Sequence, residues 1–421
     1  MREQVTSTPA IDADDRRLRF ECDTAARYTV RPVSAAAVID DAGQQLTDLL
    51  SHLVSFSTES RTPNLELIRW VAEHVESNGG RATLVQGAGD RANLLASFGP
   101  EMTGGLMLSG HTDVVPAGTG WATDPYSMTK QGDELHGRGT ADMKGFIAAI
   151  VRVVQRFRKV ELLRPLHVVL SFDEEVGCIG VRQALDVIAD RDDLRPDVVI
   201  IGEPTMMRPR HSHLGKLAYD VVCMTAAGHS SLSHSMPSAI AVAGRLLAEL
   251  DELQRRHRPV GEPGVTFNCG TITGGTALNV IAERCEFTFE VRHTVDHDPD
   301  AVLDPFRRAV DRERAALADH GGSVEVTEII RYPALRTASD DRWLRLAERI
   351  ADAGPATSLG FGTEGGLFAA ALDTSVVICG PGDIAVAHRP DEYVTVDQLL
   401  RCERFLSALV QKICVDPAAE G

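Results

Sequence analysis

The sequence predicts an α/β protein with a mainly parallel sheet, interrupted by a smaller inserted domain of ferredoxin-like α+β order. Its 421 residues exceed what one hydrophobic core usually organises, which indicates at least two domains. Short, continuous apolar runs alternate with helical stretches, as strands covered on both faces do. Between about residues 213 and 332 the expected order changes to strand, helix, two strands, helix and strand, which is the split β-α-β motif.

The elements of the larger domain are expected as follows. Residues 1–43 form an arm to which we assign no function. Helical spacing of leucine and valine begins at Gln44, and a second helix fits 65–75. The apolar runs expected to be strands are 94–98, 106–108, 166–172, 198–201 and 375–379. Further helices are expected over 144–158, 180–189 and 396–414.

The inserted segment has its own set of expected elements. Its strands are expected at 217–225, 265–272, 282–292 and 323–330, and its helices at 238–256 and 301–318. This order predicts a compact domain over 213–332. Residues 44–212 and 333–421 then form the two halves of a discontinuous α/β domain.

Composition excludes several classes of function. The net charge of −17 would repel nucleic acid and anionic membranes, so neither is an expected partner. The eight cysteines are scattered without a CxxC pair, which favours buried, reduced thiols. The first 30 residues have no apolar core of signal-peptide length, and the sequence has no run approaching the ~20 apolar residues that span a bilayer. A cytoplasmic protein is therefore expected.

Polar side chains follow the ends of the expected strands, where open α/β sheets bind ligands. His111 and Asp113 follow the run 106–108, and Glu203 follows 198–201. The other groups placed in this way are Asp142, Asp173, Glu174, Glu175 and His388. Taken singly, a histidine after a strand is usually a hydrogen-bonded loop residue, and adjacent acids are usually a solvated turn.

Placed together, these groups favour a metal cluster. Carboxylates and imidazoles that converge on one rim would repel each other unless cations held them. Such donors suit zinc, cobalt or manganese, and two imidazoles favour zinc.

Six motifs occur in an order that resembles the M20 zinc peptidase and deacylase family, and within it the acetylornithine deacetylases. The motifs are Ser109–Pro116, Gly137–Gly145, Asp173–Glu175, Gly202–Thr205, Gly228–Ser231 and Ala387–Tyr393. The resemblance covers nearly all of the chain except the N-terminal arm. It implies a two-zinc catalytic α/β domain with an inserted dimerisation domain, and hence a homodimer.

The resemblance also implies the metal ligands. Asp142 would bridge two Zn²⁺ ions, for which Co²⁺ or Mn²⁺ could substitute. His111 and Glu203 would complete one site, and Glu175 and His388 the other. A cis peptide bond is implied after Asp142.

Three further roles follow from the same family pattern. Glu174 would be the general base that passes a proton from water to the leaving amine. Asp113, two residues after His111, would accept the second imidazole N–H of this ligand. His229 would reach the partner subunit's active site and stabilise the oxyanion.

The expected substrate is N-acetylornithine, cleaved to ornithine and acetate in arginine biosynthesis. Asn279 and Arg292 match expected substrate contacts, although an arginine that ends a strand is often only a surface charge. Thr363 and Glu364 resemble the Thr-Glu motif of the acetylornithine deacetylases, and Glu364 could face the substrate ammonium. Ser238 departs from the family's usual asparagine, which affects only the detail of the helix expected at 238–256 in the inserted segment.

Other activities remain open at this point. Succinyl-diaminopimelate desuccinylases carry a Ser-Asp-Gly sequence in place of the Thr-Glu motif, and other N-acyl amino acid deacylases or dipeptidases share much of the pattern. Assays of dipeptides against N-acetyl amino acids would separate these enzymes. A scaffold or binding protein of the same fold would usually have lost a ligand or the base, and this chain has every one of them.

Overall fold

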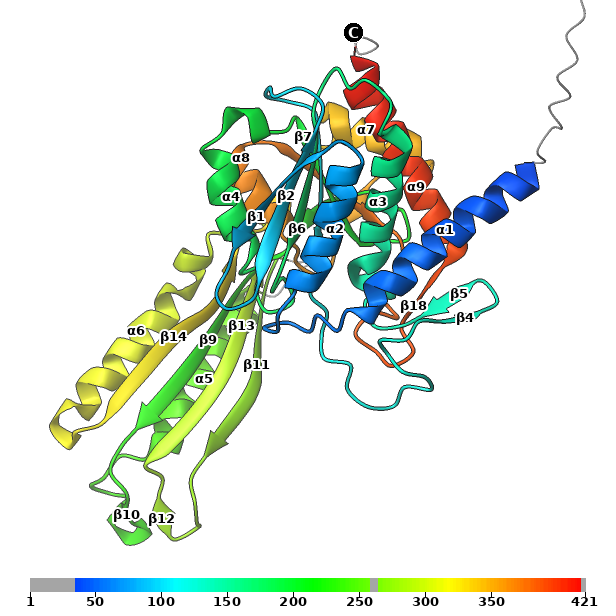
Figure 1. Ribbon diagram of the computed structural model, residues 1–421. Coiled ribbons are helices and arrows are strands. Elements are labelled where there is room, and N and C mark those ends of the chain that lie inside the picture. The colour runs from blue at the N-terminus through cyan, green and yellow to red at the C-terminus, as the bar shows by residue number, and fades with distance from the viewer. Residues whose placement is uncertain (1–34, 258–263, 418–421) are drawn as a thin grey trace, which may run out of the picture. The chain divides into compact units, whose positions relative to one another are not determined.

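The computed structural model describes residues 35–257 and 264–417 (Figure 1). Residues 1–34 of the expected arm lie outside the described residues, and helix α1 (Ala35–Ser55) begins within the arm's expected span. The described residues from Asp41 onward belong to one compact unit, which contains all four sheets described below.

A nine-stranded mixed sheet forms the larger layer. Its order is β1-β2-β6-β3-β7-β17-β8-β15, with β16 beside β8. The central strands β6, β3, β7 and β17 are parallel, whereas β2 and β8 join them antiparallel. The α/β fold class is therefore confirmed, and its parallel character is concentrated at the centre. The bounds are β1 Arg81–Gln86, β2 Ala92–Phe98, β3 Leu106–His111, β6 Leu166–Ser171, β7 Val198–Pro204, β8 Arg210–His213, β15 Leu335–Arg336, β16 Thr357–Ser358 and β17 Ser375–Gly380.

Helices cover both faces of this sheet (Figure 1). Val168 and Ile200 pack in one core with α2, α3, α7 and α9, whereas Val169 and Ile201 pack in another with α4 and α8. Successive strand residues thus point into different cores, which explains why the runs are apolar throughout rather than alternating. The bounds are α2 Leu65–Ser77, α3 Gly145–Phe157, α4 Val181–Ala189, α7 Arg342–Ala351, α8 Gly365–Leu372 and α9 Val396–Val410.

A four-stranded antiparallel sheet, in the order β11-β13-β9-β14, has its own core with helices α5 and α6. Its chain order is the expected strand, helix, two strands, helix and strand. The expected domain boundaries at 213 and 332 stay a prediction. The bounds are β9 Gly215–Met224, α5 Ala239–Arg256, β11 Val265–Gly274, β13 Arg284–His293, α6 Pro299–Leu317 and β14 Ser323–Tyr332.

Two small sheets complete the described strands. β4 (Thr129–Gln131), β5 (Glu134–His136) and β18 (Tyr393–Thr395) form one, and β10 (Gly228–His229) pairs with β12 (Val280–Ile281) in the other. None of the helices in the described part of the chain combines the length and apolar character that crossing a membrane requires.

Candidate metal centre

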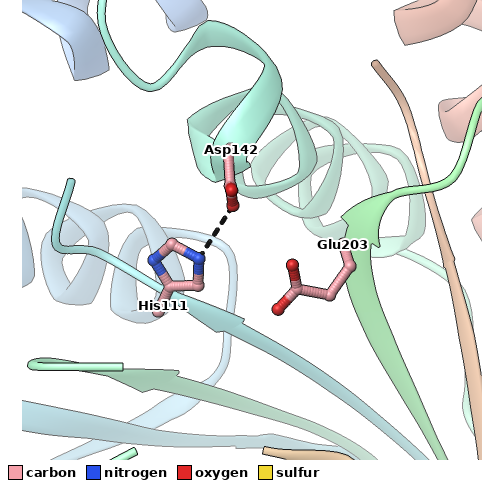
Figure 2. Close-up of side chains that lie close together, drawn as sticks. All are labelled: His111, Asp142 and Glu203. Carbon is pink, nitrogen blue, oxygen red and sulfur yellow. Dashed lines mark hydrogen bonds and ion pairs between the residues drawn. The ribbon is translucent and has the colours of Figure 1, made fainter. Parts of the chain in front are cut away.

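Three of the expected ligands meet where the central parallel strands end. His111 is the last residue of β3, and Glu203 lies near the end of the adjacent strand β7. Asp142 precedes helix α3, and Figure 2 shows the three side chains pointing toward one another. Gly202 lets α3 approach this strand, because a Cβ there would lie 2.0 Å from the Phe146 ring.

The five expected ligands form two groups that share Asp142. His111, Asp142 and Glu203 make one group, and Asp142, Glu175 and His388 make the other, with the potential ligand atoms of each group within 4.8 Å of one another. His111 Nε2 lies 3.0 Å from Asp142 Oδ1. His388 Nε2 lies 3.2 Å from Asp142 Oδ2 and 2.9 Å from Glu175 Oε1. The first group is buried, whereas the exposed His388 opens the second to solvent.

The electrostatics of the two groups fit divalent cations. Burial and repulsion from Asp142 raise the pKa of Glu203 well above its ordinary value and also raise that of Glu175. Burial would raise the pKa of Asp142 too, but hydrogen bonds from His111 and His388 hold it below the ordinary value. Without a cation, the raised pKa values of Glu203 and Glu175 favour their protonated, neutral form, and a bound divalent cation would stabilise the ionised form instead. One imidazole and two carboxylates per group are donors that zinc accepts.

The chain around Asp142 follows the expected local structure. The peptide bond between Asp142 and Met143 is cis, as the family resemblance implied. This bond lies in the segment Thr140–Lys144, where Asp142 and Met143 have non-helical backbone angles, and the segment leads directly into α3.

Asp113 contacts His111 through its main-chain oxygen rather than through the expected carboxylate. The Nδ1–H group of His111 donates to the main-chain carbonyl oxygen of Asp113 at 2.8 Å, while the nearer carboxylate oxygen stands 3.7 Å away. The carboxylate instead accepts hydrogen bonds from the Glu174 and Glu175 N–H groups, at 3.0 and 3.3 Å, and from the Ser60 hydroxyl at 2.8 Å. Asp113 therefore fixes the tautomer of His111 with its carbonyl and organises the Glu174–Glu175 turn with its carboxylate.

Glu174 lies beside both groups without belonging to either. Burial raises the pKa of its carboxyl well above the ordinary value. The buried thiol of Cys178 lies 3.4 Å from Glu174 Oε1 and can donate a weak hydrogen bond to it. Sequence reasoning gave Cys178 no role beyond that of a buried thiol.

A cavity of about 340 Å³ connects these residues with the four-stranded sheet. It is lined by Asp142, Glu174, Glu175, Gly177, Glu203, Lys216, Arg292, Ile330, Tyr332, Phe361, Gly362, Ile384 and His388. Lys216 and Tyr332 were not among the site residues expected from the sequence. Lys216 lies opposite Arg292 in the β9–β13 pairing, and a strand register is not visible in a single sequence. Both side chains form ion pairs with Glu290: Lys216 Nζ lies 2.8 Å from Oε2, and Arg292 Nε lies 2.9 Å from Oε1.

Thr363 and Glu364 follow Phe361 and Gly362 of the cavity wall. Both are buried, and neither is among the residues that line the cavity. Neither carboxylate oxygen of Glu364 makes a hydrogen bond of normal geometry among the described residues, although the Ser171 hydroxyl is near enough to lower the pKa of Glu364 against the larger effect of burial. Burial raises the pKa of Glu364 to about 7. Its charge is near enough to contribute to the raised pKa of Glu174.

His229 and Asn279 do not join the centre within one chain. They lie together at the antiparallel β10–β12 pair, where the Ser230 N–H group donates to the Asn279 carbonyl oxygen at 3.0 Å. Strand β9 runs from Gly215, beside the cavity residue Lys216, to Met224. The β10–β12 pair therefore lies at the end of the four-stranded sheet that is away from the cavity (Figure 1). His229 is exposed there.

Comparisons with known proteins match most of the chain. Residues 107–412 match the model of peptidase family M20/M25/M40. An acetylornithine deacetylase of Myxococcus xanthus is 33% identical over 391 residues, covering 89% of this chain and 99% of that protein. An acetylornithine deacetylase of Pasteurella multocida (strain Pm70) is 31% identical over 362 residues, covering 83% and 92%. The crystal structure of the M20 family metallo-carboxypeptidase Sso-CP2 from Sulfolobus solfataricus superimposes with a TM-score of 0.72 at 17% identity, covering 87% of this chain and 98% of that one.

Proposed function

The chain belongs to peptidase family M20/M25/M40, and from this premise we propose that it hydrolyses N-acetylornithine to ornithine and acetate in arginine biosynthesis. It is a metal-dependent hydrolase. The observation that carries the proposal is the pair of ligand groups that share Asp142 and border one cavity with Glu174.

Two zinc ions are the proposed cofactors, with Co²⁺ or Mn²⁺ as possible substitutes. His111, Asp142 and Glu203 would hold one ion, and Asp142, Glu175 and His388 the other. When bound, the ions supply Lewis acidity, which polarises the amide carbonyl and lowers the pKa of water.

Side chains of this protein carry out the proton transfers and bind the substrate. Glu174 takes a proton from the attacking water as the new carbon–oxygen bond forms, and delivers it to the nitrogen as the carbon–nitrogen bond breaks. The N–H groups of Glu174 and Glu175 both donate to the Asp113 carboxylate, which keeps Glu174, the general base, beside Glu175, a ligand of the second group. Arg292 offers a cation in the cavity wall for the carboxylate of the substrate.

Substrate selection is proposed to depend on charges of opposite sign. N-acetylornithine carries a carboxylate and a side-chain ammonium, and it therefore requires one basic and one acidic contact. Arg292 supplies the basic contact. Glu364 supplies the acidic one, because its buried carboxylate lacks a hydrogen-bond partner among the described residues and an ammonium would satisfy it.

Glu364→Gln is expected to raise the KM for N-acetylornithine by roughly 10- to 100-fold, since a charge-assisted hydrogen bond is lost. Hydrolysis of N-acetylmethionine, which has no ammonium, should change little. Steady-state kinetics on both substrates measure the difference. The variant should fold, because it replaces an unpaired buried carboxylate with a neutral side chain of the same shape. An equal loss on both substrates would remove Glu364 from substrate selection.

A deacylation screen on zinc-loaded protein tests the function itself. The substrates are N-acetylornithine, succinyl-diaminopimelate, N-acetylcitrulline, N-acetylmethionine and several dipeptides. The highest kcat/KM is expected on N-acetylornithine. Faster cleavage of dipeptides would make the chain a peptidase, and turnover of none would favour a binding protein of the same fold.

We also propose a homodimer formed through the four-stranded sheet and the β10–β12 pair. The distal place of His229 and Asn279 supports this, because both match active-site residues of the family yet lie away from the ligand groups of their own chain. In a dimer, His229 would stabilise the oxyanion in the partner's cavity.

Co-expression of two inactive variants tests this exchange between subunits. His229→Ala and Glu174→Ala chains should each be inactive alone, whereas random mixing should restore about a quarter of the wild-type activity, because half of the dimers hold one intact site of two. Differently tagged chains allow mixed dimers to be isolated. Mixed dimers without activity would show that His229 does not act in the partner.

A cytoplasmic location is proposed from the thiols. The seven cysteines among the described residues are free, and six of them are buried. This usage suits a reducing compartment. Recovery of the protein in a membrane or secreted fraction would contradict the proposal.

A further inference from the structure

Two of the sequence motifs contain a charged residue that the proposed chemistry does not use. Arg138 precedes the bridging residue Asp142, and Glu392 follows His388. Both residues are buried at 1% exposure, and Arg138 Nη1 lies 2.6 Å from Glu392 Oε2. An ion pair as buried as this is costly unless further hydrogen bonds complete it, so its other contacts indicate what it holds in place.

Glu392 holds the backbone of the bridging ligand. Its second carboxylate oxygen, Oε1, accepts hydrogen bonds from the N–H groups of Ala141 and Asp142, at 2.9 and 3.1 Å. Its main-chain oxygen accepts the Gly137 N–H group at 2.9 Å. The following strand β18 pairs with β5, just before the Asp142 turn. The segment that carries His388 is therefore fastened to the segment that carries Asp142.

Arg138 is itself fixed by a third segment. Its Nη2 donates to the Ala117 carbonyl oxygen at 3.3 Å, and its guanidinium lies over the Trp121 ring, 5.0 Å from the centroid. Its main-chain N–H group donates to the Pro125 carbonyl oxygen at 2.8 Å. The guanidinium is thus oriented before it meets Glu392, and it sets which carboxylate oxygen is left for the Asp142 turn.

We propose that Arg138 and Glu392 are positioning residues for the second cation, the one held by Asp142, Glu175 and His388. The inference rests on the proposed metal centre. Glu392 binds the backbone of Asp142 directly and lies four positions after His388, so one carboxylate sets the relative placement of two ligands of that site. The first site, formed by His111, Asp142 and Glu203, depends on Glu392 only through Asp142. Its other two ligands are positioned by strands β3 and β7.

Zinc binding to metal-stripped protein tests the proposal. In Glu392→Gln, competition with a chromophoric chelator is expected to show a first zinc bound nearly as in the wild type and a second bound roughly 10- to 100-fold more weakly, the usual cost of losing a partner that orients ligands. The double variant Arg138→Gln/Glu392→Gln should show the same pattern. Because the double variant removes both charges, neither is left buried without a partner. It can therefore be measured even if the single variant fails to fold.

Glu403→Gln is the matched control. Glu403 is a buried carboxylate on α9 whose partner Arg152 on α3 lies 3.6 Å away. This control should lower the melting temperature of metal-free protein without changing either zinc affinity.

Unchanged zinc affinities in the Glu392 variants, with only a lower melting temperature, would reduce the pair to a structural role. Equal weakening of both sites would also overturn the proposal. If wild-type protein binds two zinc ions but does not hydrolyse N-acetylornithine, the proposed substrate fails while the positioning role is still decided by the zinc titration. A wild type that binds only one ion overturns both proposals.

Discussion

Replacing Asp142 with alanine is expected to remove both metal ions and all measurable turnover. Its two carboxylate oxygens face different imidazoles, His111 at 3.0 Å and His388 at 3.2 Å, so each group loses its shared ligand. Metal analysis after dialysis should give two zinc ions per chain in the wild type and none in the variant. Zinc at about 100 times its Kd should stabilise the wild type by about 2.7 kcal/mol for each occupied site, and this gain should vanish in the variant.

His388→Ala is the control for the shared position, because it belongs to one group only. It should retain the ion held by His111 and Glu203. If Asp142→Ala still bound one ion tightly, the two groups would be independent sites and Asp142 would not bridge them.

Glu174→Ala is expected to retain both metal ions while kcat falls by about 10²- to 10⁴-fold, the usual contribution of a general base. Glu174 lines the cavity beside the ligand groups but is a member of neither. Metal analysis and steady-state kinetics on the same preparation separate the two effects. Substrate binding should be preserved, so the loss should fall on kcat rather than on KM.

Two further variants make this test specific. Glu174→Gln keeps the shape of the side chain but cannot accept a proton, and should be as slow as alanine. Glu203→Ala should lose metal as well as activity. Loss of metal from Glu174→Ala would make Glu174 a ligand and contradict its assignment as the base.

The ligand groups are the part of the site that the sequence indicated most directly. Apolar runs mark parallel strands, and the ends of parallel strands meet at one edge of a sheet. His111 and Glu203 could therefore be placed near each other without coordinates. Asp142, Glu175 and His388 needed the motif order as well, because loops rather than strands carry them.

Partners within the site were less predictable. The spacing of His111 and Asp113 indicated correctly that they interact, but not which oxygen of Asp113 is used. That choice depends on the N–H groups of Glu174 and Glu175, which compete for the carboxylate. Helix α8 was also missed, because it begins with two glycines and has no polar face to give a helical period.

The sequence by itself determined the α/β class and the order of elements in the inserted segment, because hydrophobic period is a local property of the chain. It also indicated the residues that could bind metal, through the strand ends for His111 and Glu203 and through the order of the motifs for the other three. Only the tertiary structure decided that Glu364 is buried without a hydrogen-bond partner among the described residues, that Lys216 faces the cavity and that Glu392 holds the Asp142 turn. Each of these depends on segments far apart in sequence, whose contacts are set by strand register and by packing between layers rather than by any local pattern.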